Sequence, residues 1–132
     1  MTKSPLKILI ADDDPGILSV AERYLRHEGY DIVTACNGIE AWDKVKSDDP
    51  DILILDINMP HRDGLTVLRD LRTNPPDKKW RPVAILSGRH ELGYINKGYE
   101  FEVDCYLTKP CSLQELLRVV RLMTGLIPLR NP

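Results

Sequence analysis

The sequence has few cysteines, no long apolar run and little net charge of either sign. The three cysteines, Cys36, Cys105 and Cys111, form no Cys-x-x-Cys pair and lack a histidine at zinc-ligand spacing, so we expect reduced packing residues rather than disulfides or a zinc site. No stretch approaches the ~18 apolar residues of a membrane span. Residues 1–5 lead into a short apolar stretch without a small-residue cleavage site, which predicts a cytoplasmic protein. The formal net charge of -2 argues against a surface dominated by nucleic-acid binding.

The composition is that of an ordinary globular domain, 42% hydrophobic and 29% charged. A chain of 132 residues can bury roughly two-thirds of its unfolded surface around one core. We therefore predict a single domain over residues 1–125. Gly125 is expected to end the last helix, and residues 126–132 to form a C-terminal tail or the start of a linker.

Short apolar runs alternate with helical patterns along the chain. The runs at residues 6–11, 52–55 and 83–86 predict buried strands, residues 31–35 alternate like an edge strand, and residues 104–108 predict a fifth strand. Helical patterns begin at Pro15, Gly38, Gly64 and the capping box at residues 112–115, and a weak helix is expected at 90–97 because Gly93 and Gly98 are poor helix formers. This alternation predicts an α/β fold: a (βα)5 flavodoxin-like doubly wound parallel sheet with strand order 2-1-3-4-5.

Acidic residues stand at the ends of two strands that are neighbours in this order. Asp12 and Asp13 follow the first strand, and Asp56 follows the third. Open α/β sheets bind ligands in the crevice beyond the carboxyl ends of such strands. Three carboxylates in one place repel one another unless a cation neutralises them, and their oxygen atoms suit a hydrated Mg²⁺. The sequence therefore predicts a magnesium site.

A hydroxyl and an ammonium group are expected at the same edge of the sheet. Ser87 follows the fourth strand and Lys109 follows the fifth. Together with Mg²⁺, these groups would allow Asp56 to attack a phosphoryl group and form an acyl phosphate, with charge on the phosphoryl oxygens offset by Lys109 and the metal.

Each of these residues also has a plainer interpretation. Asp12 and Asp13 could be helix caps, Ser87 a turn residue and Lys109 a solvated charge. Asp14 is assigned only as a helix cap. His61 lacks an identifiable carboxylate partner and is expected to be an exposed polar residue, and residues 78–81 are expected to form an exposed basic loop with a partly packed tryptophan.

The chain resembles the receiver domain of two-component response regulators over residues 6 to about 124. The resemblance rests on four motifs in the right order and element context: Asp12-Asp13 after the first strand, residues 55–60 with Asp63-Gly64, residues 86–88, and residues 104–110 with Lys109-Pro110. Residues 100–104 depart from the small-residue stretch that is common there, and Phe101 and Glu102 could alter the packing of that turn.

The resemblance implies a role for each motif residue. Asp56 would be the phosphoacceptor, and Asp12 and Asp13 the acidic pair, of which Asp13 binds Mg²⁺ more directly. Asn58 would lend its backbone carbonyl to the metal. Ser87 would bond a phosphoryl oxygen and Lys109 would pair with the phosphate. Ser87 and Tyr106 would form the switch, although Tyr106 could also be an ordinary core residue.

The resemblance further implies a phosphorelay partner and a signalling face. A sensor histidine kinase or a histidine phosphotransfer protein would donate the phosphoryl group, and the domain would catalyse only its own phosphorylation and dephosphorylation. Its downstream protein target would bind the face made by the helix at 90–97, the strand at 104–108 and the last helix. We expect a monomer or a weak phosphorylation-dependent dimer, with no direct contact with nucleic acid or membrane.

Two other classes of function are open to a chain of this kind. A receiver-like scaffold that is never phosphorylated would be expected to have lost an acidic residue or the lysine, and none is missing here. A phosphatase of the haloacid-dehalogenase type needs a second acidic residue two positions after the nucleophile, where this chain has Asn58. Both are therefore weaker hypotheses than a working receiver.

Overall fold

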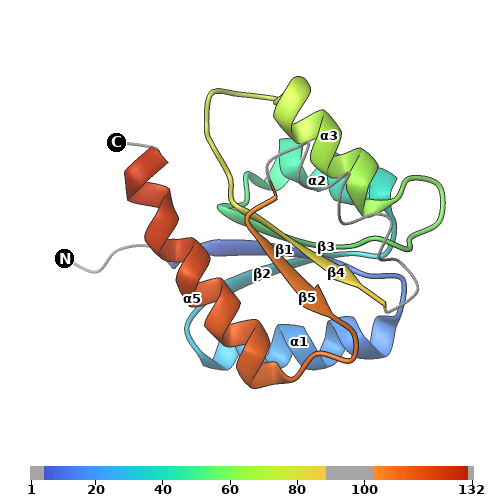
Figure 1. Ribbon diagram of the computed structural model, residues 1–132, viewed down its shortest axis with the longest axis vertical. Helices are drawn as coiled ribbons and strands as arrows, with labels where there is room; N and C mark the ends of the chain where they lie inside the picture. The colour runs from blue at the N-terminus through green and yellow to red at the C-terminus, as the bar shows by residue number, and fades with distance from the viewer. Residues whose placement is uncertain (1–4, 89–102, 131–132) are drawn as a thin grey trace.

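The computed structural model describes residues 5–88 and 103–130 (Figure 1). The elements in chain order are β1 (Lys7–Ala11), α1 (Pro15–His27), β2 (Asp31–Ala35), α2 (Gly38–Asp48), β3 (Ile52–Asp56), α3 (Gly64–Thr73), β4 (Val83–Ser87), β5 (Cys105–Thr108) and α5 (Leu113–Arg130). The helix predicted at 90–97 lies outside the described residues, as do Phe101 and Glu102. No helix in the described ranges is long and apolar enough to cross a membrane.

The five strands form one parallel sheet in the order β2-β1-β3-β4-β5, which confirms the predicted fold class and strand order. Helices α2 and α3 cover one face of the sheet, and α1 and α5 cover the other (Figure 1). Because β1 and β3 are paired in the middle of the sheet, their carboxyl ends lie side by side. The residues that follow these two strands therefore meet at one edge.

Side chains alternate along the central strands between two buried cores. In β3, Ile52 and Ile54 pack with α1 and α5, whereas Leu53 and Leu55 pack with α2 and α3. Both faces of this strand are buried, which explains its unbroken apolar sequence. Continuing the same strand, Asp56 is only 2% exposed. A carboxylate thus stands where the apolar sequence would predict another core residue.

The first helix begins where the sequence predicts, and a glycine follows its end. The Asp14 side chain accepts hydrogen bonds from the backbone N–H groups of Gly16 and Ile17, and Pro15 occupies the first helical turn. At the other end Gly29 has a φ of 99°, a conformation that glycine adopts without strain. The assignment of Asp14 as a helix cap is therefore confirmed.

The predicted end of the last helix is wrong. α5 continues through Gly125 to Arg130, so residues 126–130 are helical rather than a tail. A glycine inside a helix costs about 1 kcal/mol relative to alanine. The additional turn brings the partly buried Ile127 against the core shared by α1 and α5, and this contact favours continuation of the helix.

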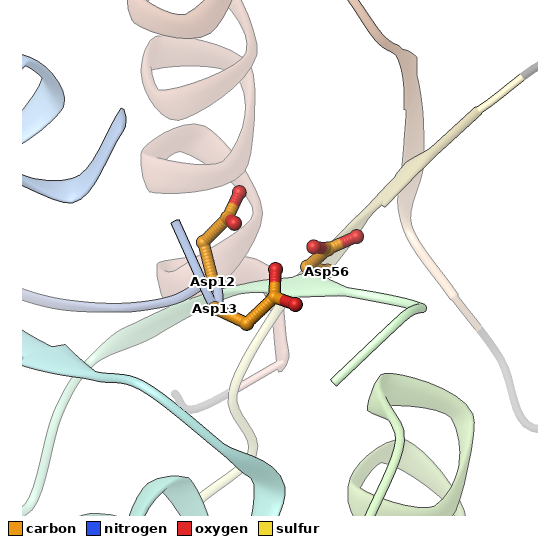
Figure 2. A group of neighbouring side chains, drawn as sticks. All are labelled: Asp12, Asp13 and Asp56. Carbon is orange, nitrogen blue, oxygen red and sulfur yellow. The ribbon is translucent and has the colours of Figure 1, made fainter. Parts of the chain in front are cut away.

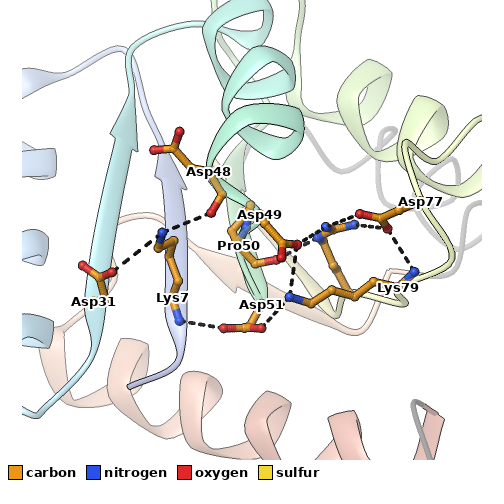
Figure 3. Close-up of polar contacts among 9 residues, drawn as sticks. Lys7, Asp31, Asp48, Asp49, Pro50, Asp51, Asp77 and Lys79 are labelled. Carbon is orange, nitrogen blue, oxygen red and sulfur yellow. Dashed lines mark hydrogen bonds and ion pairs between the residues drawn. The ribbon is translucent and has the colours of Figure 1, made fainter. Parts of the chain in front are cut away.

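The loop at residues 78–81 is not the exposed basic segment that the sequence predicts, because Arg81 is buried. Its guanidinium group donates hydrogen bonds to Asp49 at 2.6 Å, to Asp77 at 2.9 and 3.0 Å, and to the carbonyl of Pro50 at 2.7 Å. Nearby, Lys79 Nζ lies 2.6 Å from Asp51 Oδ1 and 3.2 Å from Asp49 Oδ1 (Figure 3). These contacts tie the loop before β4 to the turn before β3.

Trp80 is partly buried, as predicted, with the guanidinium carbon of Arg72 5.6 Å from its ring centroid. Arg72 also donates a hydrogen bond to Asp104 at 3.1 Å, and both side chains of this pair are about nine-tenths buried. The amino ends of β3, β4 and β5 are thus held by ion pairs in which Arg72, Arg81 and Asp104 are largely buried.

Candidate functional site

Three carboxylates gather at the carboxyl edge of the sheet, as the strand order predicts. Asp12 and Asp13 follow β1, and Asp56 is the last residue of β3 (Figure 2). Each offers a carboxylate oxygen, and these oxygens lie within 4.8 Å of one another. Asp12 and Asp56 are buried, whereas Asp13 is exposed. The cluster therefore has two carboxylates fixed in the fold and one that faces solvent.

Lys109 brings a cation to the two buried carboxylates. Its Nζ atom donates a hydrogen bond to Asp56 Oδ2 at 2.8 Å and lies 3.1 Å from Asp12 Oδ2. The contact with Asp12 is an ion pair rather than a hydrogen bond, and Asp12 Oδ2 accepts no hydrogen bond from the described part of the chain. One ammonium group thus serves two buried carboxylates, and Asp12 Oδ2 is left without a hydrogen bond from the described residues.

The charge of Asp56 is finely balanced. The net pKa of Asp56 is raised to about 6, because burial and, to a smaller extent, the Asp12 carboxylate outweigh the lowering by the Lys109 ammonium. Burial lowers the pKa of Lys109, but its hydrogen bond to Asp56 and its attraction to Asp56 and Asp12 outweigh the effect of burial, so the net shift is upward. Near pH 7 Asp56 is therefore mostly ionised and Lys109 is charged.

The loop that leaves β3 is closely packed. A Cβ atom at Gly64 would lie 2.3 Å from the carbonyl oxygen of Asp56, so only glycine fits where α3 begins. Asp63 caps that helix by accepting a hydrogen bond from the N–H of Thr66 at 2.8 Å. The Asp63-Gly64 pair therefore fixes the backbone on the far side of Asp56.

The other predicted site residues lie in three different environments. Ser87 is buried at the end of β4, and its carbonyl accepts a hydrogen bond from the N–H of Lys109 at 2.8 Å. Asn58 is exposed beside the cluster, and its N–H donates to Asp56 Oδ1 at 3.3 Å. Tyr106 is partly buried in β5 and packs on the core shared by α2 and α3. His61 is exposed, as predicted, and has a φ of 69°.

A cavity of about 970 Å³ opens beside the carboxylates. Its lining includes Asp13, Asp56 and Lys109 at the polar end and apolar residues of α1 and α5 at the other. Ile17, which the helical pattern assigns to the inner face of α1, is 42% exposed and lines this cavity. Sequence periodicity could not reveal the cavity, because its walls are residues that also read as ordinary core.

The donor set suits a hard divalent cation. Oxygen atoms of three carboxylates converge, two of them buried, and Asp12 Oδ2 is a buried acceptor without a hydrogen bond from the described residues. Carboxylate and carbonyl oxygens with open positions for water are the ligands that Mg²⁺ prefers. The cluster could therefore bind a metal ion.

Comparison with known proteins defines the class of this chain. The sequence family described as "Response regulator receiver domain" matches residues 8–121. The chain therefore belongs to the receiver domain family of two-component response regulators.

Individual relatives agree with this assignment. Response regulator MprA of Mycobacterium avium (strain 104) is 39% identical over 116 residues, which is 88% of this chain and 50% of that protein. The chain thus spans about half the length of the curated relatives that it matches.

Two solved structures share the fold over nearly their whole length. A putative response regulator from Chloroflexus aurantiacus J-10-fl is 32% identical with a TM-score of 0.82, and the match covers 92% of this chain and 98% of that one. The chemotaxis protein CheY4 of Vibrio cholerae is 26% identical with a TM-score of 0.82, over 90% and 98%.

Proposed function

We propose that Asp56 accepts a phosphoryl group from a phosphohistidine of a sensor histidine kinase or a histidine phosphotransfer protein. The observation that carries this proposal is the position of Lys109 Nζ, 2.8 Å from Asp56 Oδ2, within a cluster that also holds Asp12 and Asp13. A nucleophile, a cation for the phosphoryl oxygens and oxygen ligands for a metal are the parts that phosphoryl transfer requires. Membership of the receiver family supports a histidine-linked donor.

In the proposed step, an Asp56 carboxylate oxygen attacks phosphorus while the phosphorus–nitrogen bond of phosphohistidine breaks. The bonding electron pair leaves with the imidazole nitrogen, which takes up a proton. Because the pKa of Asp56 is about 6, the carboxylate is available as a nucleophile at neutral pH. Lys109, already within 3.1 Å of both buried carboxylates, is placed to pair with the incoming phosphoryl oxygens. The domain acts on its own aspartate rather than on a separate substrate.

Mg²⁺ would be held by Asp12, Asp13, Asp56 and the backbone carbonyl of Asn58, with Asp13 as the more direct ligand of the acidic pair. The support is the convergence of the carboxylate oxygens within 4.8 Å. When bound, the ion would offset the negative charge that collects on the phosphoryl oxygens. Ser87, buried at the end of β4, would donate its hydroxyl to a phosphoryl oxygen.

The test is incubation with acetyl phosphate and Mg²⁺ followed by phosphopeptide mapping. We expect one labelled residue, Asp56, and no labelling of an Asp56→Ala variant. Asp43→Ala, which changes a carboxylate that is 67% exposed on α2, is the matched control and should be labelled like the parent. Labelling that persists without Asp56 would contradict the assignment, and no labelling of the parent would favour a scaffold that is never phosphorylated.

Phosphorylation would change the conformation of the domain through the side chains of Ser87 and Tyr106. Movement of the Ser87 hydroxyl toward the phosphoryl group would free space that the Tyr106 ring can take. A hydrogen bond to a charged group contributes about 1.5–3 kcal/mol, enough to shift a two-state equilibrium more than tenfold. The proposed docking face for a downstream protein includes β5 and α5. With a beryllofluoride phosphate mimic, NMR shifts should spread from Ser87 to Tyr106; shifts confined to the loops around Asp56 would exclude this output.

A further inference from the structure

The amino terminus of α2 lies against the loop that carries Asn58. A Cβ atom added at Gly38 would lie 1.9 Å from the carbonyl oxygen of Arg62 and 2.5 Å from its carbonyl carbon. Ordinary contacts of a Cβ atom begin at 3.4 Å, so even alanine would force one of the two segments to move. Gly38 belongs to α2 and Arg62 to the β3–α3 loop, so this contact joins two segments that are separate in the sequence.

The helix is the firmer of the two segments. Asn37 caps α2 by accepting a hydrogen bond from the N–H of Glu40 at 2.8 Å, and Ala41 and Val45 are at most 1% exposed in the core. In the loop, by contrast, Asn58, Pro60 and His61 are exposed, and Met59 is the one buried residue of 58–62. Added volume at Gly38 would therefore displace the loop rather than the helix.

The loop cannot absorb such a displacement at its other end. The N–H of Ile57 donates to the carbonyl of Leu86, and the N–H of Gly64 donates to the carbonyl of Ile57. Gly64 also packs directly against the carbonyl of Asp56. Movement at Arg62 is thus confined to residues 58–62, the segment that contains Asn58.

We propose that Gly38 is a positioning residue that holds the β3–α3 loop where the backbone carbonyl of Asn58 can reach the metal. The expected effect on Mg²⁺ binding rests on the proposed function. The effect of Gly38 on the position of the loop does not, because it is expected without metal. Residues that orient metal ligands typically change metal affinity 10- to 100-fold when altered. Gly38→Ala and Gly38→Ser, which add the same Cβ atom, are expected to weaken Mg²⁺ binding about equally, by tenfold or more.

Two other glycines provide matched controls. Gly29→Ala strains the backbone, because φ is 99° there, but the new Cβ atom meets nothing within 4 Å. Gly125→Ala adds a Cβ atom to open space on α5. Gly29→Ala should therefore lower the melting temperature yet keep the Mg²⁺ dissociation constant within twofold of the parent. A loss of affinity in Gly38→Ala that Gly29→Ala matches would assign the effect to general destabilisation and overturn the inference.

The decisive measurement uses backbone amide NMR shifts of the metal-free proteins, with Mg²⁺ affinity by calorimetry as the second readout. Gly38→Ala should move the amides of residues 58, 59, 61 and 62 most, whereas displacement confined to residues 36–41 would show that the helix yields and would refute the proposal. If the parent binds no Mg²⁺, the proposed metal site fails while the metal-free shifts still decide the role of Gly38.

A second measurement needs no variant at position 38 and covers the case in which Gly38→Ala does not fold. In the parent protein, Mg²⁺ should shift the amides of Gly38 and Arg62 together with that of Asn58 and leave those of Gly29 and Gly125 in place. A Gly38 amide that does not respond while Asn58 does would overturn the proposal.

Discussion

The two edges of the sheet differ in how their charges are paired. At the amino ends of the strands, each carboxylate lies within 4 Å of a lysine or arginine: Asp31, Asp49, Asp51 and Asp77. At the carboxyl ends, Asp12 and Asp56 share the single ammonium group of Lys109. The first edge is electrically satisfied within the described chain and braces loops against the sheet (Figure 3). The second edge keeps negative charge in a partly buried place (Figure 2). The paired charges at the amino edge stabilise the fold, whereas the excess negative charge at the carboxyl edge can interact with a ligand.

The largest effect is expected from unbalancing the amino edge. Asp49→Asn with Asp77→Asn keeps side-chain shape, and asparagine tolerates the left-handed backbone of Asp49, whose φ is 50°. The buried Arg81 guanidinium would then lose both charged partners. Breaking a buried pair costs about 3–5 kcal/mol, and we expect about 3 because both carboxylates are partly in water. Urea denaturation measures this loss of stability, with Asp43→Asn as the control. Equal stability of the double variant and the control would show that Arg81 does not need a charged partner.

Removing charge from the carboxyl edge should have the opposite sign. The pKa of Asp56 is about 6 in the fold against 3.8 as the ordinary value, so the folded state holds this proton more tightly than the unfolded chain. Ionisation therefore destabilises the fold progressively as the pH rises from about 4 to 6, and fully above that. A shift of this size corresponds to about 3 kcal/mol. Because the substitution also weakens the hydrogen bond from Lys109, we expect Asp56→Asn to raise the free energy of unfolding by only about 2 kcal/mol at pH 7.5 in a chelator.

The pH series supplies the check on that gain. It should shrink as the pH falls and vanish below about pH 4, where the parent carboxyl is protonated in both states. A gain that does not depend on pH would mean that shape, not charge, limits the stability of this edge.

Mg²⁺ should stabilise the protein through the carboxyl edge of the sheet, and substitutions at the amino edge should not change this effect. Mg²⁺ at ten times its dissociation constant should stabilise the parent by about 1.4 kcal/mol, seen as a higher melting temperature. Asp13→Ala should reduce this rise, because it removes the solvent-facing carboxylate of the cluster. Asp49→Asn, at the opposite edge, should keep it. If Asp13→Ala responds to Mg²⁺ as the parent does, the cluster is not the metal site.

These two edges differ in how far the sequence could predict them. The convergence of Asp12, Asp13 and Asp56 follows from the apolar strands and the order of a doubly wound sheet, since each residue stands at a strand end. The amino edge depends on contacts such as that of Arg81 with Asp49, which are 32 residues apart and join two irregular turns. Periodicity carries no information about how irregular turns meet, so the burial of Arg81 could not be foreseen.

The same reasoning explains the error at α5. Gly125 is a helix stop by propensity, but Ile127 gains burial on a core assembled from distant segments. Local helix-stop signals therefore do not decide where a helix ends when the residues that follow pack on the core.

The smallest predicted effect concerns one left-handed residue at each edge. His61 has a φ of 69° on the exposed loop, so His61→Gly should relieve backbone strain and raise the free energy of unfolding by up to about 1 kcal/mol. Asp49→Gly relieves the same kind of strain but removes the ion pairs with Lys79 and Arg81, and should lower stability instead. A denaturant midpoint that rises for Asp49→Gly, as it should for His61→Gly, would show that the Asp49 ion pairs do not contribute to stability.

The packing of Gly64 against the carbonyl of Asp56 also constrains chain length. The segment between these residues is closed by that contact and by the hydrogen bond from Gly64 N–H to the Ile57 carbonyl, so it has no slack for an added residue. The segment between α3 and β4 is different, because residues 74–78 are exposed ahead of the anchor at Arg81. An insertion scan should therefore find that extra residues are tolerated at 74–76 and prevent folding at 57–63. The length of the β3–α3 connection is thus constrained, whereas the α3–β4 connection can vary in length.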